Sequence, residues 1–272
     1  MSGTPGYFDE DAGRARHYAL LMLGDAFLLL HTDLPREGPG SDECTREALR
    51  RLRPLLPPSP QVLDLGCGPG RQTLVLAKEL GTSITAVDSH EPFLKRLEAE
   101  AAAQGLGDMV RTRRADFAAL EDAPGSVDLI WSEGAIYILG WGAGLRRWRP
   151  VLREGGLLAA SEATWLTDSP PSEAADFWRE AYPRMGTIAS NSATAREAGF
   201  EVLDTFVLPA PAWWDEYYHP LEARMAALRE RARGDADLST AIAETEREIE
   251  LYTRYGASYG YVFYLLRAQG GR

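Results

Sequence analysis

Between residues 62 and 160, short apolar segments alternate with segments that have helical spacing. Apolar runs of strand length that end in glycine or polar turns predict buried strands, and their alternation with helices predicts parallel strands joined by right-handed crossovers. The strands expected here are Val62–Leu65, Ile84–Val87, Met109–Ala115, Val127–Trp131 and Leu157–Ala160. The third is more polar than the others, so we expect it near the edge of the sheet. This pattern predicts an α/β fold with helices on both faces.

A proline-rich stretch, residues 56–60, separates this alternation from a helical N-terminal segment, since proline cannot continue a helix. We therefore predict a helical lid segment over residues 1–57 and a main domain over residues 58–272. The remaining helices are expected at Gln72–Leu80, Glu91–Gln104, Leu145–Leu152, Ser172–Tyr182 and Thr194–Ala198. A sixth strand is expected at Phe200–Leu208, a helical insertion at about 210–256 over the carboxyl edge of the sheet, and a last strand at Tyr259–Arg267.

Charge and composition exclude several classes of protein. Acidic residues outnumber lysine and arginine by 40 to 29, and the net charge of −11 would repel a nucleic-acid backbone and favour a cationic ligand. The chain has two cysteines, Cys44 and Cys67, and four histidines without metal-ligand spacing, which predicts no metal site and a reducing, cytoplasmic location. The apolar stretch Tyr18–Leu30 is too short to cross a bilayer, so we interpret it as a buried helix and expect no membrane partner.

The most informative motif is the glycine-rich turn that follows the first strand. Gly66, Gly68 and Gly70 permit positive φ and close approach of a ligand to the backbone, at the start of a helix whose amide groups point outward. The spacing is G-x-G-x-G with Asp64 ahead of it, and Arg71 stands where a dinucleotide fingerprint has its third glycine. This motif resembles the first motif of class I S-adenosylmethionine-dependent methyltransferases.

The ends of the next three strands agree with that resemblance. Asp88 follows the second strand, where a carboxylate can accept hydrogen bonds from both ribose hydroxyls. The family resemblance implies that Asp116 binds the adenine amino group, that Phe117 packs on the base, and that the loop at Glu133 lies beside the reactive methyl group. The predicted binding residues for S-adenosylmethionine are Asp64, Gly66, Cys67, Gly68, Gly70, Asp88, Ser89, Asp116, Phe117 and Glu133.

The similarity extends over nearly the whole chain. The segments that carry it are Arg36–Ser41, Trp131–Tyr137, Ser161–Trp165, Asp176–Trp178, Ala181–Pro183 and Tyr259–Tyr264. With them the chain resembles a bacterial subgroup related to the methyltransferases of ubiquinone and menaquinone biosynthesis. The resemblance implies a Rossmann-like, seven-stranded, mostly parallel sheet whose last strand is antiparallel. It says little about the acceptor or the oligomeric state.

The acceptor is expected to be a small molecule, aligned for in-line transfer. The cofactor brings the activation, so a general base is needed only where the acceptor atom must lose a proton. The candidate bases on the loop after the fourth strand are Glu133 and Tyr137. For Glu133 we expect cofactor binding or support of the loop rather than catalysis. The predicted pocket residues are His31, which is also a weaker candidate base, Trp131, Trp165, Trp178 and Tyr182. Such aromatic walls would suit an aromatic or cationic acceptor.

Two alternatives stay open at this point. One is a non-catalytic protein that binds S-adenosylmethionine as a sensor or as a subunit of a complex. The other is a nicotinamide-dependent oxidoreductase with an irregular fingerprint, which Arg71 and the pair Asp64 and Asp116 disfavour.

Overall fold

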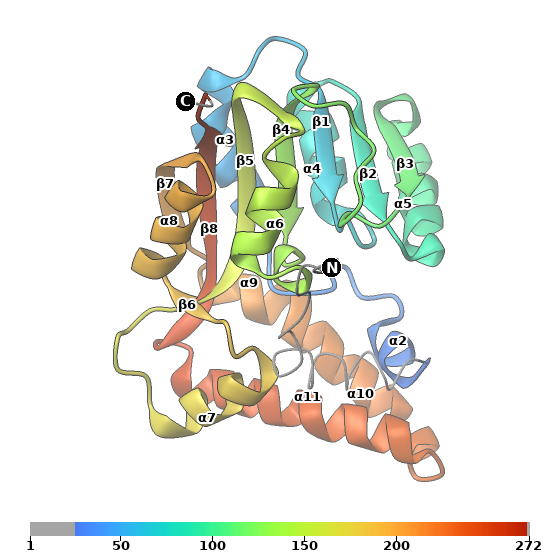
Figure 1. Cartoon of the computed structure of the whole chain (residues 1–272). Helices are drawn as coiled ribbons and strands as arrows, with labels where there is room; N and C mark the ends of the chain where they lie inside the picture. Colours follow the sequence, from blue (N-terminus) through green and yellow to red (C-terminus); the bar gives the residue numbers. More distant parts are fainter. Residues whose placement is uncertain (1–24, 271–272) are drawn as a thin grey trace, which may run out of the picture.

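The computed structural model describes residues 25–270, which form a mixed sheet with helices on both faces (Figure 1). The eight strands are β1 (Val62–Leu65), β2 (Ile84–Asp88), β3 (Val110–Arg114), β4 (Val127–Glu133), β5 (Leu152–Trp165), β6 (Gly186–Thr187), β7 (Phe200–Val207) and β8 (Tyr259–Ala268). Their order is β3-β2-β1-β4-β5-β8-β7, and β6 pairs separately with β5. The predicted α/β class is confirmed.

Strand directions also agree with the expectation. The pairs from β3 through β5 are parallel, whereas β8 runs antiparallel to β5 and β7. The polar β3 lies at the edge, as predicted. Two strands differ from the sequence expectation: β5 is much longer than the predicted Leu157–Ala160, and the two-residue β6 was missed because so short a pairing has no periodicity.

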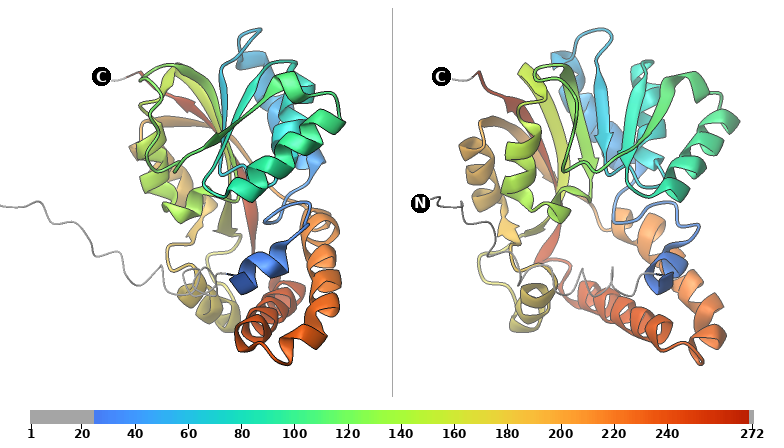
Figure 2. Two further views of the ribbon diagram at one scale, coloured as in Figure 1. Left: turned by 90° about the vertical axis from the view of Figure 1, so that its right-hand side faces the viewer. Right: turned by 45° about the vertical axis from the view of Figure 1, so that its right-hand side comes forward.

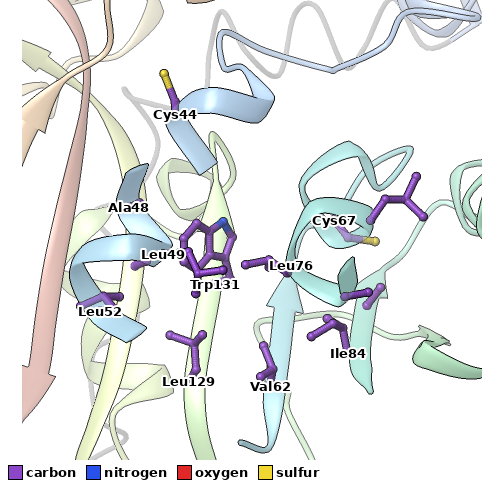
Figure 3. Close-up of a cluster of buried hydrophobic side chains, with 14 of the residues drawn as sticks. Cys44, Ala48, Leu49, Leu52, Val62, Cys67, Leu76, Ile84, Leu129 and Trp131 are labelled. Atoms are coloured by element: carbon purple, nitrogen blue, oxygen red, sulfur yellow. The ribbon is translucent and has the colours of Figure 1, made fainter. Parts of the chain in front are cut away.

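The sheet is covered by α3 (Asp42–Leu52), α4 (Arg71–Leu80) and α5 (Glu91–Ala103) on one face and by α6 (Trp141–Trp148) and α8 (Ile188–Glu197) on the other. Alternate strand residues face opposite sides. Leu129 and Trp131 therefore pack under α3 and α4 (Figure 3), whereas Ile130 packs under α6. Trp131 is fully buried in this core. Short 3-10 turns, η1 (Arg53–Leu55), η2 (Gly107–Met109) and η3 (Ile136–Ile138), connect these elements.

Two predicted helices on the second face were placed inaccurately. Helix α6 begins at Trp141 and ends before Leu152, because Leu152 already belongs to β5. Helix α8 begins well before the predicted Thr194, at an N-cap where the Thr187 hydroxyl accepts a hydrogen bond from the Ser190 amide. The first residues of α8, 188–193, are mostly small or polar and carry no strong helical pattern, so the start of the helix was missed.

A helical cap lies beyond the carboxyl ends of the central strands (Figure 2). It consists of α2 (Asp25–His31), α7 (Ser172–Ala181), α9 (Pro211–Trp213), the π-helical turn η4 (Trp214–Tyr218), α10 (His219–Ala232) and α11 (Ala236–Tyr255). The predicted insertion at 210–256 corresponds to α9 through α11. Within residues 25–270, no helix combines the length and hydropathy needed to cross a bilayer.

The predicted lid over residues 1–57 needs division. Helix α3 packs in the helical layer of the sheet, so within the described part of this segment it is α2 and the loop that follows it, residues 32–41, that lie at the cap. The start of the predicted helix Tyr18–Leu30, up to residue 24, lies outside the described residues. A lid function for the remaining part stays a prediction.

Candidate functional site

The glycine turn after β1 requires its glycines. Gly66, Gly68 and Gly70 all have positive φ, a conformation that side chains with a Cβ rarely adopt. A Cβ on Gly66 would lie 2.4 Å from the Cβ of Ala135, in the loop after β4. The Gly66 and Cys67 amides both donate to the carbonyl oxygen of Val87, at 2.9 and 3.1 Å. The turn is therefore clamped between β2 and the loop after β4.

Asp88, at the end of β2, is held by backbone donors. Its Oδ2 accepts a hydrogen bond from the Gly68 amide at 2.9 Å, and its Oδ1 accepts one from the His90 amide at 2.8 Å. A carboxylate has about four acceptor positions, so both oxygens can still accept hydrogen bonds from a ligand. Asp88 is thus fixed in place with capacity for a pair of hydroxyl groups.

Two adjoining cavities are lined by residues that the structure describes, and the larger, about 360 Å³, lies over this turn. The predicted cofactor residues that line it are Gly66, Cys67, Gly68, Asp88, Ser89, Phe117 and Glu133. The residues that sequence reasoning missed are Phe27, Leu28, Arg36, Glu37, Gly38, Pro39, Gln72, His90, Phe93 and Ile138, among others. The lining combines hydrogen-bond acceptors such as Asp88 with apolar side chains such as Phe93 and Phe117, a combination that suits a nucleoside.

Three predicted cofactor residues do not line this cavity. Asp64 is fully buried and accepts a hydrogen bond from Thr73 at 2.5 Å, so it anchors the start of α4. Burial also raises the pKa of Asp64 to about 7. Gly70 faces Leu97, whose Cδ1 would lie 2.3 Å from an added Cβ. Asp116 accepts a hydrogen bond from the Ala118 amide at 2.8 Å and shapes its own turn.

Glu133 is enclosed by three hydrogen-bond donors. Its Oε1 accepts from the Thr45 hydroxyl at 2.7 Å and from the Trp131 indole at 2.8 Å, and its Oε2 accepts from Arg36 at 3.1 Å. Burial raises the pKa of Glu133, although Arg36 opposes this shift. Because both oxygens are engaged, Glu133 is suited to supporting its loop and the cavity wall. The sequence analysis had also favoured this role over proton abstraction.

Arg36 connects this carboxylate to the rest of the site. The guanidinium is 4% exposed and also donates to Asp42 of α3 at 3.0 Å and to Glu216 of η4 at 2.8 Å. One buried cation therefore joins the loop after α2, the end of β4, α3 and the cap. A bidentate guanidinium is suited to such multiple contacts.

A second cavity, about 140 Å³, lies between the first cavity and the cap. The two share the lining residues Phe27, Glu37, Gly38, Pro39, Gly134 and Tyr137. The predicted pocket residues His31, Trp178 and Tyr182 line the smaller cavity. Tyr137 meets the ring of Tyr182 edge-on at 6.0 Å between centroids, and burial raises its pKa above the ordinary range, which keeps it a neutral phenol.

The two other predicted pocket tryptophans line neither cavity. Trp131 is fully buried in the sheet core, because it points to the face covered by α3, and it only reaches the site through its hydrogen bond to Glu133. Trp165 packs edge-on against Tyr259 at the end of β5. Their place as pocket walls is therefore corrected: one supports Glu133, and the other packs in the cap.

Residues of the smaller cavity that sequence reasoning missed come mainly from the cap. They include Trp213, Tyr217, Glu244, Glu248 and Tyr261. Tyr261 lies within one of the segments that carry the family resemblance, as do Glu37 and Gly38, so these three could have been found. The glutamates of α11 gave no signal, because their spacing is also that of an ordinary solvated helix face.

Beside this cavity, Tyr182 donates a hydrogen bond to Glu162 Oε1 at 2.5 Å. Glu162 is 1% exposed, and burial raises its pKa to about 8. Because the folded-state pKa lies above the unfolded value, the protonated carboxyl stabilises the protein fully below about pH 4.5, and this stabilisation is lost as the pH rises towards 8.

Glu162→Gln, which mimics the neutral carboxyl, is expected to become more stable than the parent protein by a few kcal/mol as the pH rises from 5 to 8. Urea unfolding at both pH values measures this difference. A difference that does not change with pH would contradict a neutral buried Glu162.

The chain is similar to known methyltransferases. A family model described as a methyltransferase domain matches residues 62–156. The 27-O-demethylrifamycin SV methyltransferase of Amycolatopsis mediterranei is 28% identical over 70% of this chain and 72% of its own length. The sarcosine/dimethylglycine N-methyltransferase of Halorhodospira halochloris is 28% identical over 72% of this chain and 70% of its own length.

Among solved structures, a methyltransferase from Geobacter sulfurreducens in complex with S-adenosylhomocysteine superposes with a TM-score of 0.77, covering 90% of this chain and 98% of its own at 21% identity. The fold therefore matches one in which the cofactor product has been seen. These matches show a methyltransferase domain over residues 62–156 and, for the chain, the fold of S-adenosylmethionine-dependent methyltransferases, in which the glycine turn and Asp88 lie at the cavity.

Proposed function

We propose that this protein transfers a methyl group from S-adenosylmethionine in the larger cavity to a small-molecule acceptor in the smaller one. The observation that carries the proposal is the shared wall of six residues between the cavities, which includes Gly134 and Tyr137. Two adjoining cavities of these sizes suit a nucleoside and a small molecule, and the relatives' names include small-molecule substrates.

The residues around the larger cavity fit the cofactor. Asp88 would accept hydrogen bonds from the ribose hydroxyls, the Gly66–Gly68 backbone would lie against the nucleoside, and Phe117 would pack on the base. When bound, S-adenosylmethionine supplies a sulfonium-bound methyl carbon that an acceptor lone pair can displace. The protein then has to orient the acceptor and exclude water, and the helical cap covers the cavity for that purpose.

In this proposal, His31 together with Glu37 would accept a proton from the acceptor. His31 Nδ1 lies 3.0 Å from Glu37 Oε2, and its ring stacks on Phe27 with centroids 4.0 Å apart. When Nδ1 carries the hydrogen donated to Glu37, Nε2 is left as an acceptor, the arrangement by which a carboxylate prepares a histidine base. Tyr137, a neutral phenol, would donate a hydrogen bond to the acceptor instead of acting as a base.

The non-catalytic sensor remains the competing function, and the oxidoreductase is set aside by the family assignment. A cofactor cavity without an adjoining space would be enough for a sensor. The smaller cavity and the pair of His31 and Glu37 favour catalysis. A cytoplasmic location and the absence of a nucleic-acid partner stay predictions from composition.

Asp88→Ala is expected to weaken S-adenosylhomocysteine binding about 10- to 100-fold, because hydrogen bonds to a charged group contribute about 1.5–3 kcal/mol. Titration calorimetry measures the affinity, and thermal melting confirms that the variant is folded. Asp108→Ala, at an exposed aspartate of η2, is the matched control and should bind as the parent protein does. Equal affinity of Asp88→Ala and the parent protein would place the nucleoside elsewhere.

A further inference from the structure

Gly134, in the loop after β4, lies where the two cavities meet, since it lines both of them. Its φ is +59°, and its amide donates a hydrogen bond to the Ser161 hydroxyl at 2.9 Å, which ties the loop to β5. A methyl group that passes from the larger cavity to an acceptor in the smaller one has to cross this wall. Side chains packed against Gly134 would therefore lie beside the transferred methyl group.

Tyr261 of β8 packs against Gly134 and lines the smaller cavity. Its hydroxyl oxygen and its Cε1 lie 3.8 and 3.7 Å from the position that a Cβ on Gly134 would take. The backbone of Tyr261 is fixed on both sides, because it pairs with Ala163 of β5 and its carbonyl oxygen accepts a hydrogen bond from the Leu208 amide at 2.9 Å. The ring also contacts Trp213, with centroids 5.5 Å apart. A firmly held phenol thus lies at the wall between the cavities.

The Tyr261 hydroxyl makes no hydrogen bond with any of residues 25–270, whereas the hydroxyl of Tyr182, in the same cavity, donates to Glu162. Burial raises the pKa of Tyr261 well above its ordinary value, so the hydroxyl keeps its proton. A neutral hydroxyl that lines a cavity without a partner is most stable when a ligand supplies an acceptor atom. Tyr261 therefore offers a hydrogen-bond donor to whatever occupies the smaller cavity.

The pair of His31 and Glu37 offers the complementary group. Both residues line the smaller cavity, and Glu37 also lines the larger one. Glu37 Oε2 lies 3.0 Å from His31 Nδ1, and Glu37 Oε1 is buried without a hydrogen-bond donor from the described residues. This pair can receive a hydrogen from a bound molecule. The cavity thus holds both a proton-accepting pair and the Tyr261 donor.

Together these two groups discriminate between the atoms that could take the methyl group. A hydroxyl oxygen has a hydrogen for the histidine–glutamate pair and two lone pairs, of which one can attack the methyl carbon while the other accepts from Tyr261. A neutral amine nitrogen has a single lone pair. A hydrogen bond from Tyr261 would occupy the pair of electrons that has to attack, so a donor at this wall favours oxygen over nitrogen.

The class of hydroxyl follows from acidity and size. Phenols have a pKa of about 10, against about 15.7 for water, so a phenol gives its proton to a side-chain base far more readily than an aliphatic hydroxyl does. The volume of about 140 Å³ is close to that of a cavity that holds a single benzene ring, about 150 Å³. The rings of Trp178 and Tyr182 in the wall suit an aromatic ligand.

We propose that the methyl acceptor is the hydroxyl oxygen of a one-ring phenol, and that Tyr261 donates the hydrogen bond that orients this oxygen. The proposal rests on the proposed function, since it takes the smaller cavity as the acceptor site. The acceptor oxygen gives its proton to His31, paired with Glu37, and forms a bond to the methyl carbon as the carbon–sulfur bond breaks, whose electron pair stays on sulfur. The products are a methyl ether and S-adenosylhomocysteine, and the positive charge of the sulfonium passes to the protonated base.

Three probes of nearly equal shape test the preference for oxygen: phenol, aniline and toluene. Calorimetric titration of the full chain with S-adenosylhomocysteine bound is expected to show phenol binding about 2- to 10-fold more tightly than aniline, the range of one hydrogen bond between neutral groups, with toluene the weakest. Aniline or toluene binding as tightly as phenol would overturn the proposal, and so would the failure of all three to bind at millimolar concentration.

Tyr261→Phe removes the hydroxyl and keeps the ring, so it should bind aniline as the parent protein does and lose the preference for phenol. Thermal melting should show it folded, because the hydroxyl bonds none of the described residues. Tyr259→Phe is the matched control: Tyr259 lies two residues earlier on the same face of β8, is not among the described lining residues of either cavity, and should leave the preference unchanged. A preference that survives in Tyr261→Phe would refute the role of Tyr261.

The two levels of the proposal fail differently. Absence of S-adenosylhomocysteine binding would refute the proposed function whatever the probes do. Binding of S-adenosylhomocysteine together with a preference for aniline would leave the proposed function intact and refute the hydroxyl acceptor. Loss of the phenol preference in Tyr259→Phe as well as in Tyr261→Phe would show that the effect comes from repacking of β8, and would refute a direct hydrogen bond from Tyr261.

Discussion

Arg36→Met is expected to lower the free energy of unfolding by about 3–5 kcal/mol, because it leaves the buried Glu133 carboxylate without its cation and removes the partner of Glu216. Glu133 is affected most, since its side chain is 6% exposed and Arg36 is the positive group that contacts it. Methionine keeps most of the apolar stem, so the loss is mainly electrostatic. Urea unfolding at pH 7 measures it.

Two further variants separate this cause from a packing defect. The double variant Arg36→Met with Glu133→Gln should recover part of the loss, because the uncompensated charge is gone, and a double-mutant cycle gives the coupling directly. Arg50→Met is the control: its pair with Glu47 is exposed, and the unfolding midpoint should not move. Arg36→Met as stable as the parent protein would show that the carboxylates can be neutralised without Arg36.

The position of Arg36 also bears on function. It contacts both Glu133 beside the cofactor cavity and Glu216 of the cap, and the next residue, Glu37, lines both cavities. Loss of Arg36 would therefore loosen the cap over the acceptor cavity and the wall of the cofactor cavity together. A folded Arg36→Met protein should bind S-adenosylhomocysteine less tightly even though Asp88 is untouched.

How far the sequence predicted this site depends on which interaction places each residue. Asp88, Gly66 and Gly68, which line the larger cavity, could be predicted to lie together because parallel strands bring their carboxyl ends to one edge, so local position in the chain determines where they lie. Trp131 and Trp165 were both assigned to the pocket, yet the alternation of side chains along a strand sends Trp131 to the opposite core.

The acceptor cavity could not be derived in this way. Tyr217 of η4, Glu248 of α11 and His31 of α2 meet only because the cap folds back on the sheet, and no periodicity within one segment reports such contacts. The predicted lid likewise merged two roles, since α3 completes the sheet layer while α2 covers the cavity. The hydrophobic stripe of α3 could not reveal which surface it would cover.

Gly66→Ala is the second substitution with a large expected effect, and Gly81→Ala is its matched control. Both glycines have a similar positive φ, +69° and +64°, so both substitutions should cost about 1–2 kcal/mol of backbone strain. They differ in space: an added Cβ at Gly81 meets nothing within 4 Å, whereas at Gly66 it lies 2.4 Å from the Cβ of Ala135.

Gly66→Ala should therefore cost a further 1–3 kcal/mol, roughly, from overpacking between the β1 turn and the loop after β4. Because Gly66 lines the larger cavity, its alanine variant should also bind S-adenosylhomocysteine at least about tenfold more weakly, while Gly81→Ala binds normally. Urea unfolding and calorimetry on the two proteins separate these effects. If both variants lost equal stability and kept equal affinity, Gly66 would be required for its φ alone, and the close approach of a cofactor to this turn would have to be abandoned.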